Sequence, residues 1–98
     1  MADNVSTEIV TVSLPERLTL QESVQTLERL GRSLKALPGP IVALDAGALK
    51  VFDSSAVAVL LELRRVLLEQ GKTLAVTQWP KRLRDLVGLY GVTDLLPG

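Results

Sequence analysis

The hydrophobic residues of the chain fall into short runs that alternate with longer stretches of helical spacing. Residues 9–12, 41–44 and 73–77 are rich in β-branched and aliphatic side chains, which is typical of strands, and residues 49–52 add a shorter strand-like segment. The run at 41–44 contains no polar residue, as expected of a strand covered on both faces of its sheet.

Three longer stretches, 20–37, 55–70 and 80–90, place apolar residues at intervals of three and four, which predicts helices. Proline and glycine at 38–40 end the first helix, and Gly71 occupies a C-cap position after the second. The proline that opens the third stretch suits the first turn of a helix, whose inward face is expected to carry Leu83, Leu86, Val87 and Tyr90. The inward face of the first helix is expected to carry Leu20, Val24, Leu27, Leu30, Leu34 and Leu37.

Strands that alternate with helices predict an α/β fold, with a small, mostly parallel β-sheet and helices packed against it. The chain has 98 residues, so we expect residues 1–98 to form a single domain, with the polar residues 1–7 flexible. The terminal coil at 91–98 contains two leucines that need a place in the core.

Composition narrows the range of functions. The formal net charge is +0 and only three residues are aromatic, so neither a basic surface nor a base-stacking platform for nucleic acid is expected. The sequence has no histidine and no cysteine, which removes the usual general base, the commonest zinc ligands and disulfides. We therefore expect no catalytic residues, no metal site and no cofactor.

Neither a secretory signal nor an apolar run of membrane-spanning length is visible in the sequence. The chain is therefore expected to be soluble and cytoplasmic, without direct insertion into a membrane. Such a protein can still work at a membrane by binding a subunit that spans it.

The most informative short stretch is Asp53-Ser54-Ser55, which follows a strand-like segment and opens the second helix. In parallel sheets, partners and ligands tend to meet the carboxyl ends of the strands, and this stretch should lie at such an end. Aspartate and serine are preferred N-caps, so the stretch could do no more than start a helix. A helix N-terminus also accommodates a phosphate, and a phosphorylated Ser54 would add almost two negative charges beside Asp53. The stretch is therefore either a helix cap alone or a switch that a partner protein recognises.

The second helix is apolar over an unusually wide arc of about 220°. One stripe is expected to pack on the sheet and consists of Ala56, Val59, Leu60, Leu63, Val66 and Leu67. A further stripe beside it contains Val57, Leu61 and Leu68, with Arg64 among them. This further stripe either packs on the first helix or forms an exposed patch for a protein partner.

Two other features favour structural explanations. Asp45, at the end of a strand, could be a ligand or a base, but an aspartate there more often accepts from nearby loop amides. The basic cluster "KRLRDL" at 81–86 is interrupted by Asp85 and is explained by a solvated helix face.

The segment "VFDSSAVAVLLEL" at 51–63 resembles the STAS domain, the fold of anti-sigma-factor antagonists. That family carries D-S-[ST/A]-G-[LV] at the start of a helix, and the hydroxyl residue after the aspartate is phosphorylated. The resemblance places Asp53, Ser54 and Ser55 on this motif. Ala56 replaces the glycine of the motif, and its methyl group is expected to crowd an approaching anti-sigma kinase.

A closer resemblance is to the stand-alone STAS subunit (MlaB-like) of the Mla phospholipid-transport ABC complex of Gram-negative envelopes. It rests on "AVAVLLEL", on "EQGKTLAVTQ" and on "LYGVTDLLP", within residues 40–97. The resemblance implies a non-enzymatic subunit that binds the cytoplasmic ATPase and, through it, meets the membrane permease. Ser54 then lies in the ATPase-contacting surface, and Ala56, Val57, Leu61, Arg64 and Leu68 are candidates for the same interface.

The alternative function is an anti-sigma-factor antagonist that is phosphorylated at Ser54 in a partner-switching cascade. An enzyme and a free-standing small-ligand sensor are further alternatives, and neither has a motif of its own in the sequence.

Overall fold

Eight secondary-structure elements make up the part of the chain that the structure, a computed structural model, describes, residues 10–96. They are β1 (Val10–Ser13), β2 (Arg17–Leu18), α1 (Leu20–Ala36), β3 (Ile41–Asp45), β4 (Val51–Phe52), α2 (Ser54–Leu68), β5 (Thr73–Thr77) and α3 (Lys81–Leu89). The expected flexibility of residues 1–7 and the strand position of Ile9 lie outside the described residues.

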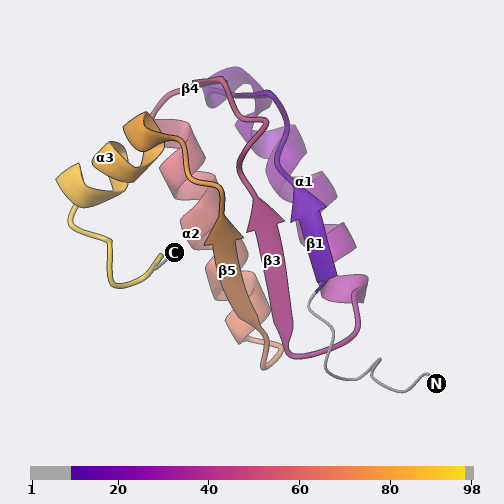
Figure 1. The fold of residues 1–98 in the computed structure, drawn as a ribbon. Helices are drawn as coiled ribbons and strands as arrows, with labels where there is room; N and C mark the ends of the chain where they lie inside the picture. Colours follow the sequence, from indigo (N-terminus) through magenta and orange to yellow (C-terminus); the bar gives the residue numbers. More distant parts are fainter. Residues whose placement is uncertain (1–9, 97–98) are drawn as a thin grey trace.

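Two small parallel sheets organise these elements. The larger sheet has the order β1-β3-β5, with Val12, Leu44 and Val76 aligned across it. In the smaller sheet β2 pairs with β4, and Leu18 is aligned with Phe52. Figure 1 shows α1 and α2 together on one face of the larger sheet, with α3 beyond the β5 edge. The predicted α/β class with a mostly parallel sheet is confirmed.

The strand β2 and the capping residues of α1 were not anticipated from the sequence, although α1 begins at Leu20 as predicted. The two-residue pairing of β2 with β4 is too short to leave an alternating pattern, although Leu18 is completely buried. Directly after it, Thr19 caps α1: its hydroxyl accepts from the Gln21 amide at 3.3 Å, and Glu22 accepts from the Thr19 amide at 2.8 Å. This capping box fixes where α1 begins.

The inward face of α1 differs from the expected one. Thr26, Leu30 and Leu34 are buried, whereas Leu20 and Val24 are 73% and 66% exposed. At 100° per residue Val24 lies about 120° around the helix from Leu30, outside the arc that faces the core. The predicted stripe was wrong at these two positions because spacing does not fix how a helix is rotated on its sheet.

The helix α2 contacts its neighbours on three sides. Its sheet-facing residues are almost completely buried and comprise Ala56, Leu60, Leu63 and Leu67. The side with Val59 and Val66 shares surface hollows with α1. The opposite side, with Val57 and Leu61, shares a hollow with Tyr90 after α3. One expectation was that the further apolar stripe packs on the first helix. That expectation was wrong, because Val57 and Leu61 face the end of α3.

The ends of α2 and α3 agree with the sequence to within one or two residues. Gly71 has a φ of 75°, and its amide donates to the Leu68 carbonyl at 3.0 Å while Lys72 donates to Leu67 at 2.9 Å. These bonds form a Schellman motif, as the glycine predicts. Pro80 is the N-cap of α3 and not its first helical residue, because its ψ of 143° is extended.

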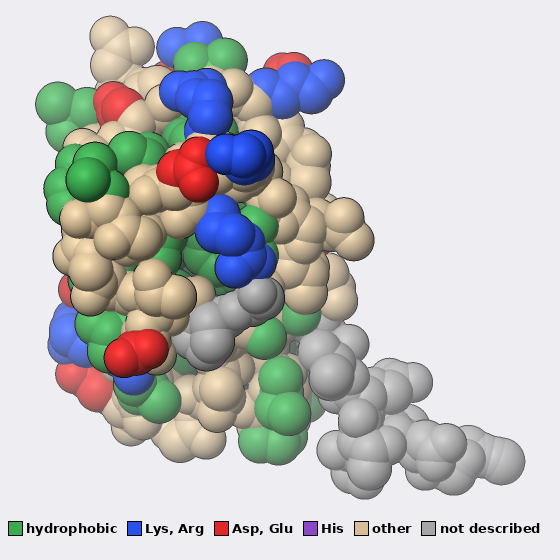
Figure 2. All heavy atoms as spheres, turned by 60° about the vertical axis from the view of Figure 1, so that its left-hand side comes forward, with side chains coloured by type: hydrophobic (Ala, Val, Ile, Leu, Met, Phe, Trp, Pro, Cys, Tyr) green, Lys and Arg blue, Asp and Glu red, His purple; other side chains and the backbone are tan. Residues whose placement is uncertain are grey.

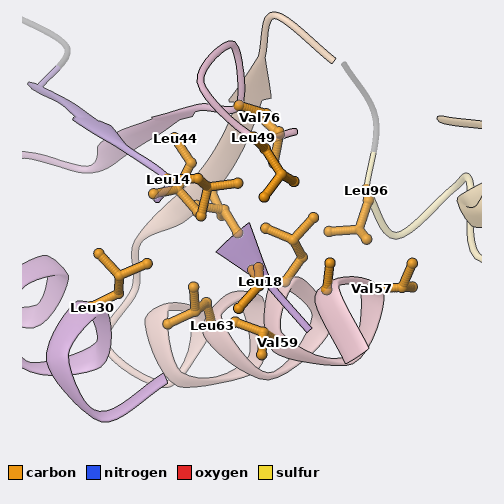
Figure 3. Close-up of a cluster of buried hydrophobic side chains, with 14 of the residues drawn as sticks. Leu14, Leu18, Leu30, Leu44, Leu49, Val57, Val59, Leu63, Val76 and Leu96 are labelled. Carbon is orange, nitrogen blue, oxygen red and sulfur yellow. The ribbon is translucent and has the colours of Figure 1, made fainter. Parts of the chain in front are cut away.

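The terminal segment returns to the core. Leu96 is 4% exposed and belongs to the same buried cluster as Val57 and Leu18, as Figure 3 shows. Leu95 is 40% exposed, so only one of the two terminal leucines is buried in the core.

Candidate functional site

The carboxylate of Asp53 lies at the meeting point of two helix N-termini. One of its oxygens, Oδ1, accepts from the Ser55 amide at 2.8 Å and caps α2. The other oxygen, Oδ2, accepts from the amide of Leu20, the first residue of α1, at 3.2 Å. The bond from Ser55, assisted by that from Leu20, lowers the pKa of Asp53 below its usual value. The capping role predicted for this residue is thus present, together with a second contact.

The two serines lie on different sides of α2. Ser54 is the first residue of the helix, is exposed, and lines a hollow with Val57, Ala58, Leu61 and Tyr90. Ser55 is half-buried and lines a second hollow, on the α1 side, which also includes Leu20, Val24 and Ala58. Ala58 is exposed and borders both hollows.

We call this region the Ser54 surface and define it by Leu20, Val24, Ser54, Ser55, Ala58, Leu61 and Tyr90. These side chains are largely apolar, with Tyr90 53% exposed, and Glu62 is a charged residue that also lines the hollow on the α1 side. A cluster of exposed apolar side chains around two hydroxyl groups is suited to a protein partner.

The five predicted interface residues differ in how far their side chains are exposed. Ala56 and Val57 are 0% and 4% exposed, so their side chains belong to the core. Leu61 and Arg64 are half-buried, and Leu68, the last residue of α2, is exposed. Of these five residues, Val57 and Leu61 border the hollow containing Ser54, and Leu61 is the more exposed of the two.

The burial of Ala56 also changes how the departure from the STAS motif is interpreted. Its methyl group points into the core, where the Ala56 side chain is fully buried. The expectation that this methyl group crowds a protein approaching the helix start was therefore wrong.

Sequence reasoning missed the residues that α1 and the end of α3 contribute to the site. Leu20 and Val24 were placed in the core because they match the helical period of their neighbours. Tyr90 was placed on the inward face of its helix for the same reason. No signal within the sequence separates these residues from core residues, because the separation depends on how the helices are rotated.

Asp45 has the structural role that was favoured. Its Oδ1 accepts from the Gly47 amide at 2.8 Å, in the loop after β3. A Cβ atom at position 47 would lie 3.0 Å from that same oxygen, so a larger residue there would require the Asp45 carboxylate to shift.

The basic residues of α3 are engaged with neighbouring side chains. Lys81 pairs with Asp85 at 3.0 Å, and the guanidinium of Arg82 lies 4.9 Å from the ring centre of Phe52. Arg84 lies 5.2 Å from the ring centre of Trp79. Figure 2 shows Lys and Arg side chains along this face, with acidic side chains among them. The arrangement fits the solvated helix face expected for "KRLRDL".

Neither a metal site nor a membrane span is found among residues 10–96. No group of three acidic side chains there is placed to hold a metal ion. None of the helices in the same part of the chain is long and apolar enough to cross a membrane.

Comparisons with known proteins agree on one fold. A family model described as "Mlab, STAS domain" matches residues 1–97. The chain is similar to the crystal structure of a sulfate transporter family protein from Wolinella succinogenes, with a TM-score of 0.72 and 15% identity, over 96% of this chain and 75% of that one. It is also similar to the SulP transporter STAS domain from Vibrio cholerae, with a TM-score of 0.70 and 13% identity, over 95% of this chain and 71% of that one. A search among curated proteins finds no match.

At these identities the solved structures establish the fold alone. Both are transporter-associated domains, and no comparison indicates an enzyme family. Domains of this kind are in general non-catalytic and regulatory.

Proposed function

The chain belongs to the MlaB-type STAS domain family, and on this basis we propose that it is a non-catalytic subunit that binds the cytoplasmic ATPase of an ABC transporter and regulates or stabilises it. The transport complex moves phospholipids in the Gram-negative envelope, as in the branch of the family that the sequence resembles. The chain then works in the cytoplasm and is held at the inner membrane only through the ATPase and its permease.

The observation that supports this proposal is the Ser54 surface. Leu20, Val24 and Tyr90 expose apolar side chains around a helix start that also carries two serine hydroxyls. Apolar and aromatic side chains that are exposed on a small domain gain free energy when a partner removes them from water. In the proposed complex the ATPase covers this surface.

Substitution of Ser54 by glutamate tests the proposal. A glutamate at the first position of α2 is compatible with the helix dipole, so the fold should be retained. In the complex, its charge would lie against an apolar partner surface without a matching cation, which is costly. We expect S54E to weaken binding to the ATPase subunit at least about tenfold, a free-energy loss of about 1.4 kcal/mol, as measured by calorimetric titration.

The matched control is S33E, which introduces the same charge on an exposed face near the other end of α1. S33E should bind the ATPase as wild type does. Equal affinity of wild type and S54E, with both folded, would remove Ser54 from the interface.

A second candidate function is favoured by one specific observation. Ser54 is exposed at the N-terminus of α2, and the inward-pointing Ala56 methyl group does not obstruct access to it. An anti-sigma kinase that phosphorylates Ser54 would make the chain an anti-sigma-factor antagonist. Phosphate transfer to Ser54, followed by mass spectrometry with S54A as the control, supports this function, and absence of labelling by the candidate kinase counts against it.

A further inference from the structure

The Ser54 surface is assembled from α1, α2 and the residue Tyr90 that follows α3. Ser54, Ser55 and Ala58 come from α2, whereas Leu20 and Val24 come from the first turns of α1. The surface is therefore continuous only if the two helix starts keep their relative position.

Two contacts link the helix starts directly. The first is the short β2–β4 ladder, which brings Leu18 beside Phe52 just before each helix begins. The second is the carboxylate of Asp53, which accepts from the Ser55 amide at 2.8 Å and from the Leu20 amide at 3.2 Å. The two helices also pack against each other along their length, but the carboxylate bridge is the hydrogen bond that joins their first turns directly.

Simple capping does not require this arrangement. An N-cap uses one oxygen acceptor, and serine, threonine or asparagine supplies it as well as aspartate does. The Leu20 amide lies 33 positions away in the sequence and is a first-turn amide of α1 that is unpaired within its own helix, so the second oxygen has a role that capping of α2 does not explain.

We propose that Asp53 is a positioning residue of the partner-binding surface, whose carboxylate joins the starts of α1 and α2 and so holds Leu20 and Val24 in one surface with Ser54. This inference rests on the proposed function, because the surface has a role only if a partner binds it. The partner is the ATPase subunit proposed above.

Three substitutions separate this role from capping. In D53N the amide oxygen can still cap α2, but the NH₂ group cannot accept from the Leu20 amide. In L20P the same bond is lost from the donor side, since proline has no N–H, and proline is well tolerated at the first position of a helix. Thr19 has a ψ of −176°, which is compatible with a following proline. L20A removes the Leu20 side chain and keeps the amide, so it is the matched control for L20P.

The first measurement concerns the isolated protein. In D53N the amide-proton NMR signal of Leu20 should move upfield, as expected when a charged acceptor is lost, while the Ser55 signal keeps its position. If the Leu20 signal is the same in wild type and D53N, the bridge is absent and the proposal is overturned, whatever the partner does.

The second measurement is the affinity for the ATPase subunit. We expect D53N to bind roughly three- to tenfold more weakly than wild type, with a melting temperature close to that of wild type. L20P should bind more weakly than L20A by a similar factor. In the D53N background this difference should vanish, because both changes remove the same bond.

The outcomes distinguish this proposal from the proposed function. If wild type binds the ATPase, S54E does not, and D53N binds as tightly as wild type, only the positioning role is overturned. If the wild-type chain does not bind the ATPase at all, the proposed function fails and the positioning role fails with it.

Discussion

One exposed carboxylate, that of Asp53, connects the first turns of α1 and α2 and adjoins the serine most exposed at the candidate site. Close by, Glu22 accepts from both the hydroxyl and the amide of Thr19, so a second carboxylate stabilises the same end of α1. Both groups accept most strongly in the ionised form, because protonation turns one carboxyl oxygen into a donor and removes the negative charge.

The pH dependence of stability follows from these two carboxylates. The Ser55 and Leu20 amides lower the pKa of Asp53, and the Thr19 hydroxyl and amide lower the pKa of Glu22. A group whose pKa is lowered by folding stabilises the protein above its unfolded pKa, which is about 4 for a carboxyl group. That stability is lost as the pH falls through the lower pKa of the folded state. Wild type should therefore lose stability on acidification below about pH 4.5 more steeply than the double variant D53N/E22Q.

Urea denaturation at a series of pH values between 7 and 3 measures this difference. Glu62, whose pKa is lowered by its bond with Arg65, is present in both proteins and contributes equally. Parallel curves for the two proteins would show that neither carboxylate is engaged as described.

The role of a single residue could be predicted where its hydrogen-bond partners lie close to it in the sequence. The cap formed by Asp53 and the glycine conformation at Gly71 were predictable, because each depends on bonds within a few residues. The bridge to Leu20 was not predictable, since its donor lies 33 positions away.

Helices and strands were predictable in their extent and less so in their orientation. The bounds of α1, α2 and β5 follow from apolar spacing together with proline, glycine and capping residues. Rotation about the helix axis does not follow from spacing, so Leu20 and Val24 were assigned to the core although they are exposed. The candidate site was consequently predicted from α2 alone, without the part contributed by α1.

A pair of glycine substitutions tests the assignment of helix ends. Gly71 ends α2 with a φ of 75°, and a Cβ atom there would meet no neighbour within 4 Å, so the cost of G71A is conformational. We expect G71A to lower the free energy of unfolding by about 1–2 kcal/mol. Chemical denaturation provides the measurement.

Gly31 is the matched control because it lies within α1 and also has no atom within 4 Å of an added Cβ. G31A should raise the free energy of unfolding by about 0.5–1 kcal/mol, since alanine is the better helix former. A gain in stability for G71A as well would contradict the left-handed conformation at the end of α2.

The whole molecule is a small parallel α/β domain whose terminal segment returns to complete the core. The alternation of strands and helices was sufficient to predict this class, and the family model confirms the STAS resemblance over residues 1–97. The neighbours of the further apolar stripe on α2 were not predictable. They come from the end of α3 and from a terminal coil that has no periodic pattern to place it.

The buried end of the chain leads to a prediction about stability. Leu96 is 4% exposed and packs in the main cluster, whereas Leu95 beside it is 40% exposed. L96A should lower the free energy of unfolding by about 2–4 kcal/mol, because it removes buried methyl groups and leaves a cavity. L95A, the matched control, should cost less than about 1 kcal/mol. Similar losses for the two variants in thermal denaturation would show that the terminal segment does not pack as described.

The most direct test of the central claim is to identify the partner in the native cell. The tagged chain would be purified in mild detergent from its own cells, with S54E as a parallel sample, and the bound proteins identified by mass spectrometry. We predict that wild type retains an ABC ATPase together with its membrane permease, and that S54E loses both. Recovery of a soluble kinase without any transport subunit would contradict the transporter assignment and make Ser54 a phosphorylation site.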